Sequence, residues 1–201
     1  MVGMPQAHSD VLEAWLGEVV ATPGLTALAG DEARRVLLDD ALRGVEHVKR
    51  FDGPVVDVGS GGGTPGIPLA VALPEREVTL VEAERRKAEF LERWAGAIPN
   101  LRVVWGRAEE QGVGGYGVAV AKALAPPVVA AEWCLPLVRE GGGCVLWVGP
   151  SAEPERVARA AERLGAELVA QPPGFLVLAR TGPLPPGFPR RAGIARKRPL
   201  A

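Results

Sequence analysis

The fold of this 201-residue chain is decided by one stretch, Val55-Val56-Asp57-Val58-Gly59-Ser60-Gly61-Gly62-Gly63-Thr64-Pro65-Gly66-Ile67-Pro68-Leu69-Ala70. Its start is short, apolar and β-branched, which is typical of a buried parallel strand. The glycines that follow remove Cβ atoms where a ligand lies against the backbone, and they permit positive φ. Pro65 and Pro68 fall where a first helical turn has N–H groups without partners. The stretch therefore predicts a strand, a glycine loop and a helix, the nucleotide-binding corner of a doubly wound sheet.

The glycine loop fits two classes of cofactor. The pattern Gly61-x-Gly63-x-x-Gly66 satisfies the dinucleotide fingerprint on its own. S-adenosylmethionine is favoured over NAD because the loop opens earlier, at Gly59, and because Pro65 interrupts the N–H groups that would hold a pyrophosphate. The next predicted strand ends in Glu82, whose carboxylate could accept both hydroxyls of a ribose. We therefore predict S-adenosylmethionine as the cofactor; the alternative is a glycine turn that binds nothing.

Length and composition describe one globular unit. With 201 residues, 47% of them hydrophobic, and a formal net charge of -1, the chain can build one sizeable core plus an appendage. We predict a single domain over 1–201, made of a helical extension (1–50), a cofactor-binding sheet core (51–182) and a basic tail (183–201). No signal peptide or apolar run of membrane length is present, so we expect a cytoplasmic monomer without membrane contact.

Few residues suit metal or nucleophile chemistry. The two cysteines, Cys134 and Cys144, lack metal-ligand spacing and lie in apolar surroundings, so we predict small core residues rather than a disulfide or a nucleophile. The histidines are His8 and His47. We predict that no metal is bound.

Apolar periodicity predicts two helices before the sheet. The first begins near Ser9, with Ser9 or Asp10 as its N-cap, and the second begins at Asp31 and ends before residues 51–54. Three more helices are predicted at 84–95, 127–139 and 153–164. The glycines at 141–143 are expected to separate elements.

Seven strands are predicted, at 55–59, 77–82, 102–106, 117–122, 142–148, 166–170 and 175–179. Only four residues separate the last two, and so short a connection joins antiparallel neighbours. We therefore predict an α/β fold, a doubly wound, Rossmann-like, seven-stranded, mostly parallel sheet with a closing antiparallel hairpin. This strand count matches the class I S-adenosylmethionine-dependent methyltransferases better than a six-stranded dinucleotide-binding fold.

The end of the chain is strongly basic. No acidic residue follows Arg180, whereas five cations gather there: Arg190, Arg191, Arg196, Lys197 and Arg198. Such a segment, held extended by the prolines before it, is suited to contact RNA phosphates. A solvated, disordered terminus is the alternative, and a third arrangement docks the tail against the body and buries Phe188. Most of Trp94, Trp105, Trp133 and Trp147 are expected in the core, with base stacking as the alternative role.

The chain resembles a known family. The likeness is densest at Asp57-Val58-Gly59-Ser60-Gly61 with Pro65-Gly66-Ile67-Pro68-Leu69-Ala70, where the Pro-Gly-Ile-Pro continuation is the most specific part. Other segments follow in family order: Leu25-Thr26-Ala27, Asp39-Asp40-Ala41-Leu42, Phe90-Leu91, Gly106-Arg107-Ala108-Glu109, Phe188-Pro189-Arg190-Arg191 and Lys197-Arg198-Pro199-Leu200. Together they resemble the bacterial small-subunit ribosomal RNA guanine-N7 methyltransferases, also called glucose-inhibited division protein B.

This resemblance implies methyl transfer from S-adenosylmethionine to guanine N7 in 16S ribosomal RNA, with that RNA or the small ribosomal subunit as partner. Ala108 and Glu109 would border the adenine of the cofactor, and Lys122 would face the cleft. The cofactor-binding residues are then predicted to be Gly59, Ser60, Gly61, Gly63, Thr64, Glu82, Ala108, Glu109 and Lys122. The chain departs from the usual family pattern at Thr64, Lys122, Val148 and Gly174.

The implied reaction needs little from the protein beyond positioning. Guanine N7 has an exposed lone pair, so no general base is required, and near-attack geometry is the main source of rate. A donor on N7 would block the methyl group, so Lys122 is predicted to orient O6 or a phosphate; the alternative is a lysine at the end of the sheet that extends to solvent. Two other functions stay open, a non-catalytic RNA-binding or ribosome-assembly paralogue and an NAD(P)-dependent oxidoreductase.

Overall fold

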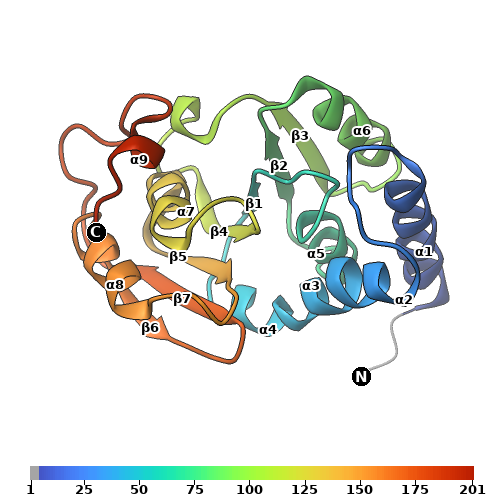
Figure 1. Cartoon of the computed structure of the whole chain (residues 1–201), viewed down its shortest axis with the longest axis horizontal. Coiled ribbons are helices and arrows are strands. Elements are labelled where there is room, and N and C mark those ends of the chain that lie inside the picture. The colour runs from blue at the N-terminus through green and yellow to red at the C-terminus, as the bar shows by residue number, and fades with distance from the viewer. Residues whose placement is uncertain (1–4) are drawn as a thin grey trace.

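A seven-stranded sheet runs through the molecule, with helices on both faces (Figure 1). The computed structural model describes residues 5–201, so the first four residues of the predicted N-terminal extension lie outside the described part. The strands are β1 (Val55–Val58), β2 (Val78–Glu82), β3 (Leu101–Trp105), β4 (Tyr116–Lys122), β5 (Val138–Trp147), β6 (Ala166–Ala170) and β7 (Phe175–Arg180). Their spatial order is β3-β2-β1-β4-β5-β7-β6, and β7 runs antiparallel to both β5 and β6. The mostly parallel sheet with a closing hairpin is confirmed.

Within residues 5–201, four of the helices precede β1, four lie between strands, and one follows β7. They are α1 (Gln6–Ala21), α2 (Gly30–Ala33), α3 (Asp40–Arg43), α4 (Val45–Val48), α5 (Gly66–Ala72), α6 (Arg85–Ala95), α7 (Pro127–Cys134), α8 (Pro154–Glu162) and α9 (Ile194–Lys197). A π-helical segment spans Arg34–Asp39, and short 3₁₀ turns span Ala108–Glu110 and Leu135–Leu137.

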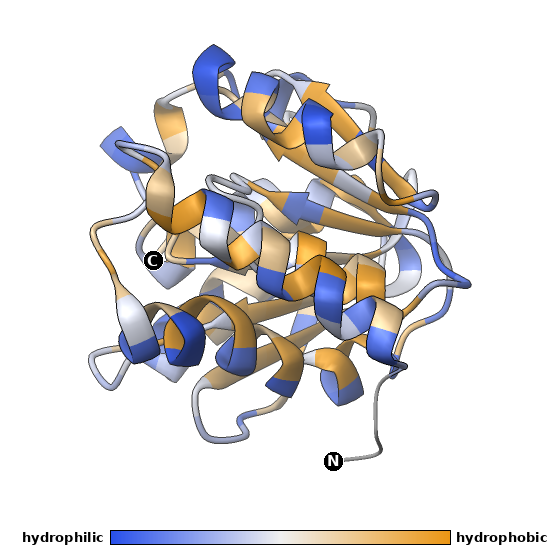
Figure 2. Ribbon diagram, turned by 90° about the vertical axis from the view of Figure 1, so that its right-hand side faces the viewer, coloured by the Kyte–Doolittle hydropathy of each residue, from blue (hydrophilic) through white to orange (hydrophobic). Residues whose placement is uncertain are grey.

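The central strands β1, β2 and β4 are buried on both faces, which explains their continuous apolar sequences. Val55 packs with residues of α1, α5 and α6 in one buried cluster, whereas its neighbour Val56 packs with residues of α7 and α8 in the other. Figure 2 shows hydrophobic colour along the strands, and both hydrophobic and hydrophilic residues on the helices that flank them. The nucleotide-binding corner thus lies between two layers of helices.

The N-terminal region differs from its predicted form. Helix α1 begins at Gln6 after Pro5, with no side-chain cap, and Asp31 lies in the first turn of α2 instead of capping it. The predicted second helix is divided into α2, the π-helical segment, α3 and α4. Gly44 separates α3 from α4, and a Cβ atom there would lie 2.0 Å from Cζ2 of Trp147. This close approach of a distant indole is a tertiary constraint that periodicity does not reveal.

A second difference concerns the helix predicted at 127–139. Helix α7 ends at Cys134, Pro136 follows in a 3₁₀ turn, and β5 already begins at Val138. Proline has no N–H to continue a helix, which accounts for the early end. The glycines at 141–143 lie within β5, where the pairing with β4 shifts between Tyr116 and Val118, so they form an irregular strand and not a boundary.

Two predictions about single residue types are confirmed, that for the cysteines and that for most of the tryptophans. Cys134 and Cys144 are free and buried, as predicted. Trp94, Trp133 and Trp147 are buried, but Trp105 is 60% exposed at the end of the edge strand β3. In residues 5–201, no helix is long and apolar enough to cross a bilayer, and no group of three potential metal ligands occurs.

Candidate cofactor pocket at the carboxyl edge of the sheet

The glycine loop folds back onto the end of β1. Asp57 is 1% exposed, and its Oδ2 accepts a hydrogen bond from the backbone N–H of Gly66, 3.0 Å away. The hydroxyl of Ser60 donates to the carbonyl of Asp57 at 3.0 Å. These contacts tie the loop and the start of α5 to the strand, with Pro65 just before the first residue of α5 as predicted.

The carboxyl group of Asp57 has a raised pKa because it is buried. Burial raises the pKa of its carboxyl group from 3.8 to about 7, and the hydrogen bond from Gly66 offsets only part of this effect. Its Oδ1 atom is buried and accepts no hydrogen bond. The Asp57 carboxyl group, under the glycine loop, therefore changes its protonation state near neutral pH.

Glu82 holds the loop from the neighbouring strand. It ends β2 with 8% of its surface exposed, Oε2 accepts from the N–H of Gly61 at 2.8 Å, and Oε1 accepts from the N–H of Glu84 at 2.7 Å. A carboxylate offers about four lone-pair sites, so capacity remains on the side that faces the pocket. Glu82 thus shapes the loop, a role that sequence reasoning did not assign to it.

A cavity of about 510 Å³ opens above the loop, a volume in the range of small-molecule sites. Its wall contains eight of the nine predicted cofactor residues: Gly59, Ser60, Gly61, Thr64, Glu82, Ala108, Glu109 and Lys122. Gly63 is not part of the wall. Gly61 has φ +55°, and no atom lies within 4 Å of the place where its Cβ would stand, so the loop presents bare backbone there.

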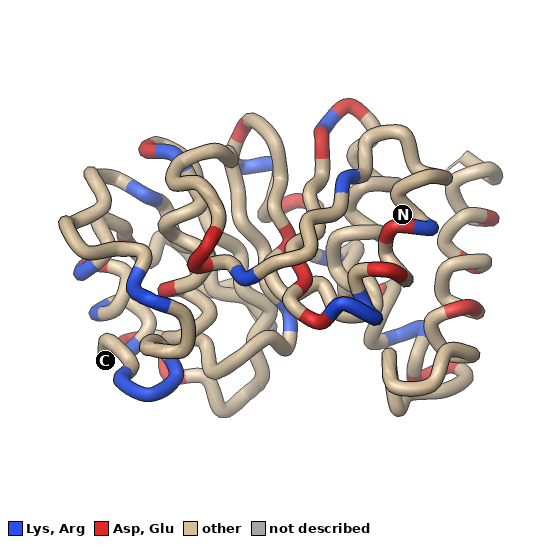
Figure 3. The backbone as a smooth tube through the Cα atoms, turned by 90° about the horizontal axis from the view of Figure 1, so that it is seen from above, with Lys and Arg blue, Asp and Glu red and all other residues tan. Residues whose placement is uncertain are grey.

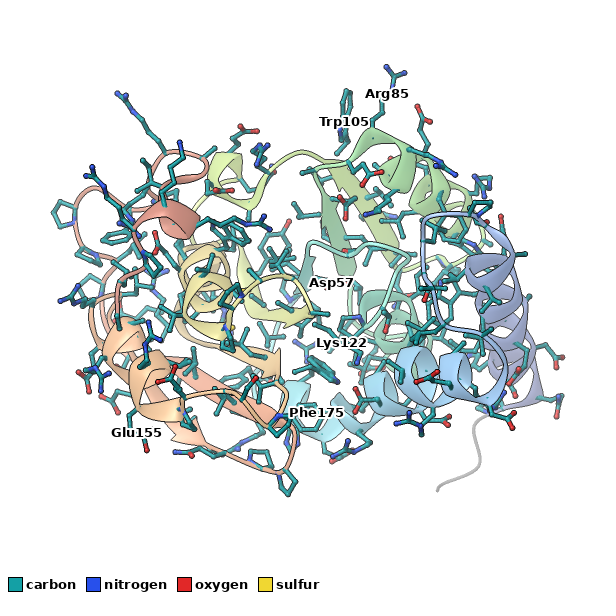
Figure 4. The ribbon with its side chains drawn as sticks, in the orientation of Figure 1. Asp57, Arg85, Trp105, Lys122, Glu155 and Phe175 are labelled. Carbon is teal, nitrogen blue, oxygen red and sulfur yellow. The ribbon has the colours of Figure 1, made fainter. Side chains whose placement is uncertain are left out.

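Lys122 ends β4 at the same cavity and is held by an ion pair. Its Nζ lies 2.6 Å from Oδ2 of Asp40, and its side chain is 11% exposed, so it does not extend to solvent. The other carboxylate oxygen of Asp40 lies 2.8 Å from Nη1 of Arg43, and the Asp40 carbonyl accepts from the indole N–H of Trp147. In Figure 4, Lys122 and Asp57 lie near the centre of the molecule.

The residue after Lys122 is backbone-strained. Ala123 has φ +52°, the only positive φ outside glycine in residues 5–201, and it lines the cavity. Strained backbone of this kind gathers at ligand sites and switch regions. Thr64 lies on the opposite wall, where its hydroxyl donates to the carbonyl of Leu37 in the π-helical segment.

The C-terminal tail docks against the body and contributes to the cavity wall. Arg190 binds both carboxylate oxygens of Glu132, whose side chain is 3% exposed, with Nε 2.5 Å from Oε1. Gly193 donates its N–H to Oε1 of Glu109 at 3.1 Å, and the guanidinium of Arg196 lies 5.2 Å from the ring centre of Trp133. The extended tail expected from its prolines is therefore replaced by the docked arrangement.

Docking divides the five cations of the tail. Arg190 has a structural partner in Glu132, whereas the other four are exposed: Arg191, Arg196, Lys197 and Arg198. Phe188 is half-buried and packs against the cluster around α7. Gly193 and Arg196 line the cavity. Sequence reasoning missed both as pocket residues; the available signal was their position between the two family-like segments 188–191 and 197–200.

Comparison with solved structures concerns the fold. The chain aligns with the Thermus thermophilus 16S rRNA N2 G1207 methyltransferase (RsmC) in complex with AdoMet and guanosine at a TM-score of 0.53 and 20% identity, over 74% of this chain and 40% of that chain. It aligns with a geranyl diphosphate methyltransferase in complex with SAM at a TM-score of 0.56 and 14% identity, over 82% of this chain and 95% of that chain. These likenesses establish the class I methyltransferase fold.

Sequence comparison identifies the family. A family model described as "GidB: rRNA small subunit methyltransferase G" matches residues 25–170. A ribosomal RNA small subunit methyltransferase G of Synechococcus elongatus is 36% identical over 182 residues, which cover 80% of this chain and 75% of the relative. One from Moorella thermoacetica is 34% identical, with 99% of this chain and 90% of the relative covered. The chain belongs to the GidB family of S-adenosylmethionine-dependent ribosomal RNA small subunit methyltransferases.

Proposed function

We propose that this protein methylates N7 of a guanine in 16S ribosomal RNA, with S-adenosylmethionine as methyl donor. The observation that supports this most strongly is the cavity itself, because the glycine loop, Glu82 and the Ala108–Glu110 turn converge on it in a chain of this family. The 201 residues are proposed to act as one methyltransferase unit, as a cytoplasmic monomer.

The residues around the cavity fit the cofactor. Gly61 leaves open space beside bare backbone, and Glu82 retains acceptor capacity next to it, as a ribose with two hydroxyls requires. Ala108 and Glu109 would border the adenine from the 3₁₀ turn after β3. When bound, S-adenosylmethionine supplies an electrophilic methyl group on a sulfonium.

The chain's task in the reaction is to hold guanine in line. Because N7 offers an exposed lone pair, no side chain has to remove a proton before attack. Lys122 presents an ammonium with three N–H donors, one of which is engaged by Asp40 at 2.6 Å. The remaining donors are available for guanine O6 or a phosphate, which leaves N7 free.

The docked tail supplies the proposed contact with the RNA backbone. Arg191, Arg196, Lys197 and Arg198 are exposed, and Arg196 stands in the cavity wall. Figure 3 shows Lys and Arg positions clustered beside the C-terminus. Cations in this place attract phosphates and release counterions, which gives salt-dependent binding. Arg190 is proposed to anchor this segment through Glu132 and to add little direct contact with RNA.

Transfer of labelled methyl groups tests the proposal. Purified protein is incubated with labelled S-adenosylmethionine and with small subunits, naked 16S RNA or whole ribosomes, all from a strain that lacks the modification. We expect label in at least one RNA acceptor, and none with a Gly61→Val variant, whose side chain would enter the cavity. Cofactor binding by calorimetry without label in any acceptor would favour the non-catalytic alternative, and preferential binding of NAD(P) would favour the oxidoreductase.

A further inference from the structure

Trp105 is the most exposed large hydrophobic side chain in residues 5–201. It is 60% exposed, whereas the strand positions on the same face, Leu101 and Val103, pack into the buried core. Helix α6 begins at Arg85 and packs against this face of the edge strand through Phe90, Leu91 and Trp94, whereas Arg85 in its first turn lies over the Trp105 ring. The indole of Trp105 therefore stays outside the core that Leu101 and Val103 join.

The indole is nevertheless held in a definite orientation. Its N–H donates to the carbonyl of Ala83 at 3.2 Å, and the guanidinium of Arg85 lies 5.4 Å from the ring centre. In Figure 4, Trp105 and Arg85 project together from the outer edge of the molecule. The guanidinium of Arg85 therefore lies over the indole ring, and the hydrogen bond to Ala83 fixes the orientation of the ring.

The Trp105 side chain lies next to residues that line the cofactor pocket. Ala83, which accepts the hydrogen bond from the indole, lines the pocket, and so do Gly106 and Arg107, the two residues that follow Trp105. Trp105 also pairs with Glu82 in the register of β3 and β2. An RNA strand with one nucleotide at the pocket mouth could therefore reach the indole with a neighbouring base.

We propose that Trp105 and Arg85 form a stacking platform for an unpaired base of the RNA that flanks the methylated nucleotide. Bases stack on aromatic rings whatever their sequence, because every base has a π face, and an arginine stacked on the ring adds to this attraction. The inference rests on the proposed RNA substrate but adds a contact outside the cofactor pocket and the basic tail.

The charges around the platform are compatible with RNA. Nε of Arg85 lies 2.9 Å from Glu89, and the acid next to Arg85, Glu84, is paired with Lys87 at 2.8 Å. Glu109, beyond Arg107, accepts the N–H of Gly193 in the docked tail. Glu84, Glu89 and Glu109 are thus engaged within the protein, and Arg85 and the exposed Arg107 supply the cations on this side of the pocket.

Binding of a fluorescein-labelled, single-stranded oligoribonucleotide and of 16S RNA to the full chain tests the proposal. Trp105→Ala should lower the affinity for each of the two RNAs by about 5- to 150-fold, which is the range expected for the loss of one stacked base. Trp105→Phe should retain most of the affinity, because a phenyl ring still stacks although it lacks the N–H bonded to Ala83. S-adenosylmethionine affinity should stay unchanged, and in methyl transfer the KM for RNA should rise with kcat unaltered.

Val169→Ala is the matched control, since Val169 is an exposed apolar residue, 43% accessible, on the opposite edge strand β6. Ultraviolet cross-linking followed by peptide mapping gives an independent readout, with attachment expected at Trp105. The proposal is overturned if Trp105→Ala binds both RNAs as the parent does, or if Trp105→Phe and Val169→Ala lose as much affinity as Trp105→Ala. The oligonucleotide measurements do not depend on catalysis, so they separate this inference from a failure of the proposed methyl transfer.

Discussion

The buried carboxyl group of Asp57 should make folding stability depend on pH in a direction opposite to that of a salt-bridged acid. Burial raises its pKa from 3.8 to about 7, so between these values the folded state binds more protons than the unfolded state. The stabilising contribution is therefore complete below the unfolded pKa and is lost as the pH rises through the folded pKa. Deprotonation leaves a buried charge whose Oδ1 has no hydrogen-bond partner.

The size of the effect follows from the two pKa values, 3.8 and about 7. One unit of pKa difference corresponds to roughly 1 to 1.5 kcal/mol, and most of the shift is titrated between pH 5 and 8, so the titration of Asp57 should remove about 2 to 3 kcal/mol of folding stability over that interval. His47 acts in the opposite direction, because burial lowers the pKa of its imidazole below 6.5 and stability is gained as the pH rises. A comparison of two proteins that both contain His47 cancels this contribution.

Asp57→Asn is the suitable perturbation. The amide keeps the shape and an oxygen acceptor for the N–H of Gly66, but it cannot become charged. Urea denaturation of both proteins at pH 5, 6, 7 and 8 gives the difference in free energy of unfolding at each pH. We expect the free energy of unfolding of the parent to fall by about 2 to 3 kcal/mol relative to that of the variant from pH 5 to pH 8. A constant difference, or one that changes with the opposite sign, would refute the reasoning about Asp57.

Three further predictions concern the pocket and the tail. Glu82→Ala should weaken S-adenosylmethionine binding in calorimetry by about 1.5 to 3 kcal/mol, through loss of the ribose contact and of the hydrogen bond to Gly61; equal affinity would leave Glu82 outside the cofactor site. Arg190→Ala should lower the free energy of unfolding, measured by thermal or chemical denaturation, by about 3 to 5 kcal/mol, because Glu132 stays buried and unpaired. Adding Glu132→Gln to this variant should restore most of the lost stability. If the double variant is as unstable as the single one, the ion pair is not the cause. Truncation after Gly187 should lower the melting temperature, the affinity for RNA and the salt dependence of RNA binding. It should also lower the affinity for the cofactor, because the tail forms part of the pocket wall. An unchanged cofactor affinity would show that this part of the wall does not contact the ligand.

The nucleotide-binding corner was predictable because its causes are local. The β-branched strand, the glycines and the first prolines of α5 act within a few residues of one another, so the order of residues predicts the geometry. The closing hairpin was predictable for the same reason, since a four-residue connection permits only antiparallel strands. Eight of nine predicted cofactor residues accordingly meet at one cavity.

The remaining features depend on residues far apart in the chain. Lys122 and Asp40 are separated by 82 positions, and nothing in the spacing of either indicates their ion pair. The contact of Arg190 with Glu132 likewise depends on how α7 packs against the tail. The exposure of Trp105 depends on how α6 packs against β3. The close approach at Gly44 involves the indole of Trp147, which lies at the end of β5, 103 positions later in the chain. Such contacts come from tertiary packing, which a one-dimensional pattern does not contain.

The most direct test of the account is the identity of the methylated atom. Small-subunit RNA that lacks the modification is incubated with the protein and S-adenosylmethionine carrying a labelled methyl group, then digested to nucleosides that are separated and identified by mass. The account predicts that the label is recovered as 7-methylguanosine, because guanine N7 can attack without a general base while Lys122 holds the O6 side of the ring. Label in any other nucleoside, such as one methylated on an exocyclic amine, would contradict it.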